Sequence, residues 1–194
     1  MSSVIPLTED QRDAVQELLN ISMGQAANSL AQLIETQICI SIPKIASITP
    51  DELFTLIQQN GQAFYTRQSF LGDVNGEVMS VLSRKGLNEV AKLLEYEEPL
   101  SKEDVQETIL ELSNILAGAC LAGLSEQLEL NTNLNMPTLF APHKATFSDL
   151  QWENSLVMEV QFDIEFSSFS MRVVFCLDHD SFNRLTQNLD ELLG

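Results

Sequence analysis

Two glutamate–asparagine pairs, each with a spacing of three residues, are the side chains of this sequence best placed to do chemistry. The first pair lies in a longer pattern of Asp13, Glu17, Asn20 and Gly24, with spacings of four, three and four residues. On an α-helix, at roughly 100° per residue, these positions fall within an arc of about 60°. They predict one narrow stripe along a helix.

The same stripe recurs in the second half of the chain as Glu107, Glu111, Asn114 and Gly118. Here it crosses an apolar segment, residues 109–124, where a carboxylate and an amide need either buried polar partners or a face that awaits another molecule. A glycine inside a helix costs about 1 kcal/mol relative to alanine. For the glycines of both stripes two explanations stay open, close packing of two helices and close approach of a partner.

The chemistry open to such a stripe is limited. Neither a carboxylate nor an amide is an activated nucleophile, and no histidine accompanies either pair as a base. An asparagine amide can hold a water molecule by donating and accepting hydrogen bonds, and a glutamate can anchor a lysine. Because phosphoryl transfer depends mainly on positioning and electrostatics, the pairs favour assistance to a substrate that brings its own metal, cation and labile phosphoryl group.

The two stripes belong to an internal repeat. At an offset of 94, residues 13–43 and 107–137 are identical at eight of 31 positions, where average composition predicts about two. The identical pairs are Glu17/Glu111, Leu18/Leu112, Asn20/Asn114, Ile21/Ile115, Gly24/Gly118, Leu30/Leu124, Glu35/Glu129 and Pro43/Pro137. We infer one domain, residues 1–194, made of two repeats at about 8–95 and 103–192, joined by a charged segment with a proline.

Each repeat predicts a long helix, a short strand, a hairpin of two longer strands and a closing helix. The expected helices are 9–36, 85–95, 102–130 and 178–193, and the expected strands are 37–45, 62–71, 77–84, 136–141, 156–166 and 171–177. Thr8 with Gln11, and Ser101 with Asp104, resemble capping boxes, and the Asn75-Gly76 pair suits a hairpin turn with positive φ. The fold class is α+β in two layers, with pseudo-twofold α-β-β-β-α units sharing one mainly antiparallel sheet against the long helices.

Composition excludes several classes of partner. The chain has 28 acidic and 10 basic residues and a formal net charge of −18, without a Lys/Arg cluster. Nucleic acids and anionic membranes are therefore not expected partners; solubility and steering toward a basic protein surface both explain the charge. The sequence lacks a signal-peptide pattern and a membrane-length apolar run, so we expect a cytoplasmic protein. No metal site is predicted: three cysteines are interpreted as core residues, and His143 and His179 as surface or turn residues.

The pattern Asp-x-x-x-Glu-x-x-Asn-x-x-x-Gly resembles the signature of the CheC/CheX/FliY phosphatases of bacterial chemotaxis, and its two copies resemble two-site CheC more than single-motif CheX. The resemblance implies that the glutamates contact the invariant lysine of a phosphorylated CheY-like receiver and that the asparagines orient the attacking water. It also implies that the receiver supplies Mg²⁺, so that the chain needs no cofactor of its own. The implied catalytic residues are Glu17, Asn20, Glu111 and Asn114, and the implied docking residues are Asp13, Gly24, Glu107 and Gly118.

The chain departs from the family pattern in the residues around the motifs. It reads Glu-Leu-Leu-Asn-Ile-Ser and Glu-Leu-Ser-Asn-Ile-Leu where the family often has Glu-Ile-Gly-Asn-Ile-Gly, and Glu107 replaces the usual Asp or Ser. Because both Glu-x-x-Asn pairs are present, we expect a hydrolase that acts on receiver aspartyl phosphate at both sites. The alternative is a non-catalytic receiver-binding adaptor or a flagellar-switch-type protein.

Two further expectations concern the oligomeric state and a second protein partner. The duplication already brings two motif helices into one chain, so we expect a monomer. The family resemblance also suggests a CheD-like deamidase as a second protein partner.

Overall fold

The computed structural model describes residues 7–58, 62–143, 155–165 and 167–194. Its helices in this part of the chain are α1 (Glu9–Ile34), α2 (Pro50–Ile57), α3 (Arg84–Leu93), α4 (Lys102–Gln127) and α6 (His179–Leu193). Its strands are β1 (Ile38–Ile40), β2 (Lys44–Ile48), β3 (Ala63–Gly72), β4 (Gly76–Ser83), β5 (Thr132–Leu134), β6 (Thr138–Leu139), β7 (Ser155–Ile164) and β8 (Ser170–Leu177).

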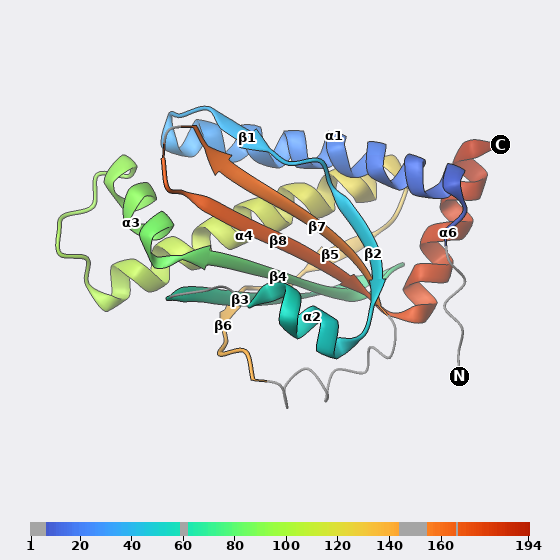
Figure 1. Ribbon diagram of the computed structural model, residues 1–194. Helices are drawn as coiled ribbons and strands as arrows, with labels where there is room; N and C mark the ends of the chain where they lie inside the picture. The colour runs from blue at the N-terminus through green and yellow to red at the C-terminus, as the bar shows by residue number, and fades with distance from the viewer. Residues whose placement is uncertain (1–6, 59–61, 144–154, 166) are drawn as a thin grey trace.

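The strands form one sheet in the order β1-β7-β8-β4-β3-β5, with β2 also pairing with β7 and β6 with β3. Every described pairing is antiparallel. Helices α1 and α4 run side by side against one face of this sheet, and α2 lies over the opposite face (Figure 1). The predicted α+β class with a shared antiparallel sheet and long motif helices is confirmed.

The two halves of the sequence interlock in the sheet. The central pair joins β4 of the first half to β8 of the second, with Met79 opposite Val174. The short strands β1 and β2 pair with β7 of the second half, and β5 and β6 pair with β3 of the first half. Each half therefore completes its edge by hydrogen bonding to the other half.

Both long helices begin where the sequence predicts. Thr8 and Gln11 form a capping box at α1, and Ser101 and Asp104 form one at α4, where their hydrogen bonds hold the pKa of the Asp104 carboxyl below its ordinary value. Helix α1 ends two residues earlier than expected, and α4 ends three residues earlier. Glu35 and Glu129, a repeat-related pair, both adopt positive φ just after these helices. This left-handed residue reverses the chain toward the first short strand.

The short strands differ from the prediction. The expected strand 37–45 is divided into β1 and β2, because Pro43 has no N–H to donate to a ladder. The expected strand 136–141 is reduced to β6, and β5 precedes it at a position where no strand was predicted. Helix α2 was also missed, although Thr49, Pro50 and Glu52 form a capping box with proline in the first turn.

The β3–β4 hairpin forms as predicted, but its unusual backbone conformation is at a different residue. Positive φ falls on Gly72, at +153°, and not on the Asn75-Gly76 pair. The Asn75 side chain accepts a hydrogen bond from the Gly72 N–H at 3.0 Å. A Cβ on Gly72 would lie 2.0 Å from the Asn131 carbonyl oxygen, so this position requires glycine.

The main core fills the space between the sheet and the two long helices. In it Cys120 of α4 lies against Met23 of α1, and Cys176 is buried on the α2 side. Burial raises the pKa of both thiols, which keeps them protonated and unreactive. Cys39 was interpreted as a core residue, and this was wrong, because its side chain is exposed on edge strand β1.

Helix α4 is the one described helix that is long and apolar enough to cross a membrane. More than half of its most apolar window is buried inside the protein, against the sheet and α1. These properties are those of the central helix of a packed core.

Candidate functional site

The first stripe lies on the outer face of α1. Asp13, Glu17 and Asn20 are all exposed, whereas the intervening Leu18 and Leu19 are buried in the core. In the described part of the chain the Glu17 and Asn20 side chains make no hydrogen bond or ion pair with the protein. Their polar groups are therefore free to bind something else.

The second stripe lies on the outer face of α4 in the same manner. Glu107, Glu111 and Asn114 are exposed, and Leu112 and Ser113 between them are buried. Of the two explanations for polar residues in this apolar helix, the structure shows an open face for all three side chains and adds one buried polar partner, Gln68, for Asn114. The stripe is polar because it is the strip of α4 that contacts solvent.

The two asparagines differ in how firmly the protein holds them. The Gln68 side chain donates from Nε2 to Asn114 Oδ1 at 3.1 Å and to the Asn135 carbonyl oxygen at 3.0 Å. Gln68 is only 2% exposed, so its amide is fixed within the core face of β3. The Asn114 side chain is thereby held through its oxygen, and its NH₂ group can still donate hydrogen bonds to another molecule. The Asn20 side chain has no such hydrogen bond among the described residues.

Sequence reasoning missed Gln68 and its neighbour Thr66. Thr66 donates to the buried Ser113 hydroxyl at 2.8 Å, next to Asn114 on α4. The strand pattern could have revealed both residues. Thr66, Gln68 and Phe70 alternate along β3 on the side that points toward the helices, and Phe70 belongs to the apolar core there, so Thr66 and Gln68 are polar residues on a core face. Such polar residues on a core face require partners.

A surface hollow of about 420 Å³ adjoins the first stripe. It is lined by Asp13, Gln16, Glu17, Asn20, Ile42 and Pro43. Gln16 donates from Nε2 to the Pro43 carbonyl oxygen at 3.1 Å, which ties the loop between β1 and β2 to α1. The sequence analysis did not single out Ile42, although it is 74% exposed beside the stripe.

The motif glycines are not sites of helix packing. A Cβ at Gly24 would have no atom within 4 Å, and at Gly118 it would meet only Leu134, at 3.9 Å. The glycine required by the contact between α1 and α4 is Gly123, where a Cβ would lie 2.8 Å from the Ser22 hydroxyl. For Gly24 and Gly118, close approach of a partner is the explanation left.

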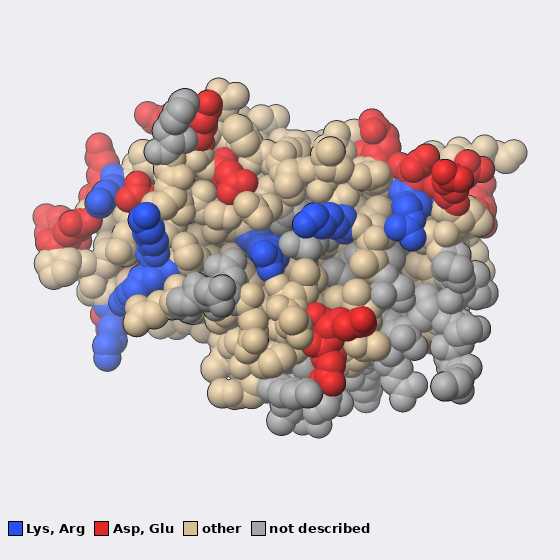
Figure 2. Space-filling view, viewed as in Figure 1, with Lys and Arg blue, Asp and Glu red and all other residues tan. Residues whose placement is uncertain are grey.

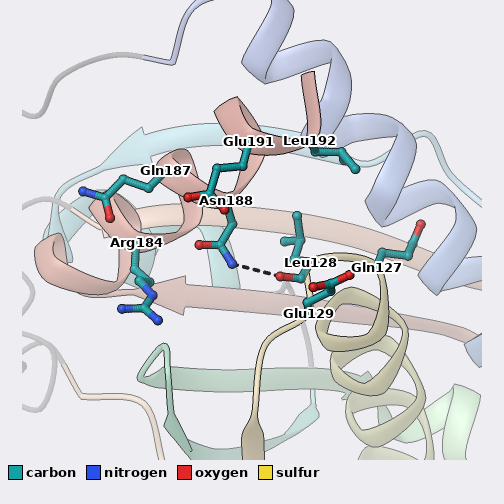
Figure 3. Close-up of a pocket in the computed structure, with 8 residues that line it drawn as sticks. All are labelled: Gln127, Leu128, Glu129, Arg184, Gln187, Asn188, Glu191 and Leu192. Atoms are coloured by element: carbon teal, nitrogen blue, oxygen red, sulfur yellow. Dashed lines mark hydrogen bonds between the residues drawn. The ribbon is translucent and has the colours of Figure 1, made fainter. Parts of the chain in front are cut away.

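The other hollows and charged groups carry less chemistry. A polar hollow of about 540 Å³ between the end of α4 and α6 is lined by Gln127, Glu129, Arg184, Asn188 and neighbours (Figure 3). There Asn188 donates to the Leu128 carbonyl oxygen at 2.9 Å, and Arg184 lies 3.8 Å from Asp73. Both groups are thus engaged in holding the fold.

On the α2 face, basic residues form one group toward the left end of the view and stand singly across the middle, while acidic residues gather toward both ends and below the middle (Figure 2). Arg67 forms an ion pair with Glu77, and Arg172 donates to the Leu56 carbonyl oxygen. His143 and His179 are exposed, and no three described His, Cys, Asp or Glu side chains gather as metal ligands. The described residues of this face do not form the continuous basic surface that nucleic acid requires.

The fold and the stripes together define a class of protein. Two rigid helices each present an exposed carboxylate and amide one turn apart, with open space above a glycine one turn further on. No nucleophile or base accompanies either pair on the helix. Such a stripe can bind a partner through charge-assisted and amide hydrogen bonds.

Comparison with known families places the chain within this class. Residues 64–161, just over half of the chain, match the model of the chemotaxis phosphatase CheX, and residues 11–46 match that of the CheC-like family. The second Glu-x-x-Asn pair lies in the first of these ranges and the first pair in the other. The chain therefore belongs to the CheC/CheX/FliY family of chemotaxis phosphatases.

Individual relatives agree with this assignment. The CheY-P phosphatase CheC of Bacillus subtilis is 26% identical, over 95% of this chain and 96% of its own length. The crystal structure of Thermotoga maritima FliY has the same fold, with a TM-score of 0.72 at 20% identity over 96% of this chain and 99% of that one. CheX of Borrelia burgdorferi, solved in a complex with CheY, BeF₃ and Mg²⁺, has a TM-score of 0.56 at 16% identity over 84% and 96%.

Proposed function

We propose that this protein removes the phosphoryl group from the aspartyl phosphate of a CheY-like receiver in the cytoplasm. The observation that carries the proposal is the pair of exposed Glu-x-x-Asn stripes, one on each long helix. Support comes from the Bacillus subtilis relative, which is named a CheY-P phosphatase, and from the Borrelia burgdorferi CheX solved with CheY.

The glutamates act first, in docking. Glu17 on α1, and Glu111 on α4, would accept hydrogen bonds from a lysine of the receiver, a charge-assisted contact that fixes the helix beside the phosphorylated aspartate. Because both glutamates are exposed and unpaired within the described chain, docking breaks no internal bond. Asp13, Glu107 and the two motif glycines flank this contact.

The asparagines act in the chemical step. The Asn20 or Asn114 amide would hold a water molecule in line with the phosphorus–oxygen bond to the receiver aspartate. The water oxygen forms a new bond to phosphorus, the bond to the aspartate breaks, and the electron pair returns to the carboxylate. Inorganic phosphate leaves, the water's proton passes to solvent or phosphate, and the Mg²⁺ bound to the receiver belongs to the substrate.

The test is the rate of phosphate loss from a purified phosphorylated CheY-like receiver, with and without this protein. We expect acceleration by the wild type, partial loss in Asn20→Ala and Asn114→Ala, and a loss of about 100-fold or more in the double variant, as when a positioning group is removed from other active sites. Gln32→Ala is the control, since Gln32 is exposed on α1 about three turns beyond Asn20 and outside the arc of the stripe. A double variant with full activity would refute the mechanism.

A second candidate function is receiver binding without hydrolysis, as an adaptor or flagellar-switch component. The observation that favours it is the fold similarity to Thermotoga maritima FliY over nearly the whole chain. Binding to phosphorylated receivers without faster phosphate loss would establish this function instead. A CheD-like deamidase partner stays a prediction, which co-purification with such a deamidase would test.

A further inference from the structure

Two large apolar side chains stand far out of the protein at repeat-equivalent positions. Met136 is 85% exposed and Ile42 is 74% exposed, more than any other large apolar side chain in the described part of the chain. The offset of 94 that superposes the two stripes also superposes Ile42 on Met136. A single exposed apolar residue is common on protein surfaces. High exposure at the equivalent position of both repeats is not explained by chance.

Each of these side chains adjoins one Glu-x-x-Asn pair. Ile42 lines the hollow that also contains Glu17 and Asn20. Met136 follows Asn135, whose carbonyl oxygen accepts a hydrogen bond from Gln68, and the same Gln68 amide nitrogen holds Asn114. The two apolar residues thus extend the two sites.

The protein fixes both loops beside their helices, but by different side-chain contacts. At the first site Gln16 on α1 binds the Pro43 carbonyl oxygen, and at the second Gln68 on β3 binds the Asn135 carbonyl oxygen. Gln16 corresponds in the repeat to Leu110, which cannot make this bond. The repeat-equivalent Ser41 and Asn135 also each donate a backbone N–H to a carbonyl oxygen of the neighbouring long strand, at 2.9 Å. Each loop is therefore held by a shared backbone contact and by a side-chain contact that differs between the sites.

A proline follows the apolar residue in both loops. Pro43 and Pro137 restrict the residue before them to extended conformations. Ile42 and Met136 are consequently held outward before any partner arrives, which lowers the entropy lost when they are buried in a complex. Methionine also adapts its shape to irregular partner surfaces.

We propose that Ile42 and Met136 are apolar docking anchors, one for each site, that insert into an apolar depression of the phosphorylated receiver next to its phosphorylated aspartate. This inference rests on the proposed function and extends it from the polar stripe to the loop beside it. The occupant is the receiver, because the anchors are continuous with the acidic stripe that suits a receiver lysine.

The decisive experiment isolates each site before its anchor is changed. In an Asn114→Ala background only the first site hydrolyses, and there Ile42→Ser should raise KM for the phosphorylated receiver about tenfold, or about 1.4 kcal/mol, with kcat unchanged. In an Asn20→Ala background the same Ile42→Ser should have no effect. Met136→Ser should give the mirror result.

Two further variants serve as controls. Ile42→Val should restore most of the affinity, because it keeps an apolar side chain in the extended loop. Leu192→Ser changes a side chain that is 55% exposed on α6, away from both stripes, and should leave KM unchanged. Thermal unfolding of every variant should match that of its background, since the altered side chains are exposed.

Direct binding separates failure of the inference from failure of the proposed function. Titration with a receiver loaded with BeF₃ and Mg²⁺ should show the weaker affinity of the Ser variants without any turnover. A wild-type protein that neither binds the receiver nor hydrolyses its phosphate would refute the proposed function. If the wild type hydrolyses the phosphate but the Ile42 and Met136 variants keep its KM and affinity, only the proposal of apolar anchors is overturned. A wild-type dimer that Ile42→Ser or Met136→Ser converts to a monomer would also overturn them, by assigning this surface to self-association.

Discussion

Replacing Gln68 by leucine removes the tether of one asparagine and leaves its position on the helix unchanged. Leucine is similar in size and is compatible with the 2% exposure of this position, but it cannot donate to Asn114 Oδ1 or to the Asn135 carbonyl oxygen. The terminal torsion of asparagine is broad, so the untethered amide would turn among several orientations. Only some of these would hold water for attack.

The size of the effect follows from one neutral hydrogen bond. Such a bond is worth about 0.5–1.5 kcal/mol net, so the loss of orientation should lower kcat at the second site by about two- to tenfold. The assay is phosphate release from the phosphorylated receiver in an Asn20→Ala background, where the second site alone acts. In an Asn114→Ala background Gln68→Leu should not change kcat.

Thr66→Val is the matched control for a general loss of stability. It removes the buried hydrogen bond between Thr66 and Ser113 on the same strand and helix, and leaves the Gln68–Asn114 contact intact. It should lower the free energy of unfolding by about 1–3 kcal/mol and keep kcat at the second site. The reasoning is refuted if Gln68→Leu keeps full kcat at the second site, or if it slows the first site equally.

Two more predictions concern a pair of glycines and one carboxylate. Gly118→Ala should raise helix stability by about 1 kcal/mol and weaken receiver binding. Gly123→Ala should instead lower the free energy of unfolding by about 1–3 kcal/mol, because its Cβ would lie 2.8 Å from Ser22 Oγ. Thermal unfolding and receiver titration of both variants check this contrast. Hydrogen bonds from the backbone and side chain of Asn131 hold the pKa of Asp73 below its ordinary value. The stabilisation by this carboxylate is therefore present above the unfolded-state pKa of about 4 and is lost as the pH falls through the lower folded-state pKa. The difference in unfolding temperature between the wild type and Asp73→Asn should accordingly be largest near neutral pH and shrink below pH 4.

The sequence predicts the regular elements of this fold well because their signals are local. The capping boxes at Thr8 and Ser101 fix the starts of the long helices, and the alternation of residues 156–164 indicates strand β7. The short strands are harder, because β1, β2, β5 and β6 are defined by pairing with a partner distant in sequence and not by their own composition. Helix α2 had a clear capping signal and was overlooked because the repeat plan left no place for it.

For the candidate sites, helical spacing alone places Glu17 with Asn20, and Glu111 with Asn114, on one face of each helix, and the structure shows that both faces are exposed. What spacing cannot show is which residues from other elements reach those faces. Gln68 is 46 residues from Asn114 in sequence, and Ile42 reaches the first site through a loop that Gln16 holds. The choice between packing and docking for the motif glycines also needed coordinates, since it depends on the empty space above them.

The short strands of each half pair with a long strand of the other half, and this limits how a version of the protein with one site can arise. A fragment with one half alone would leave a long strand, β3 or β7, hydrogen-bonded along one side only, and would expose the core face on which the other helix packs. Deletion of half the gene would therefore yield an aggregating chain and not a smaller folded protein. A point substitution in one stripe, by contrast, would inactivate that site while its helix continues to support the fold. A descendant with a single working site would therefore be expected to keep the full length of the chain.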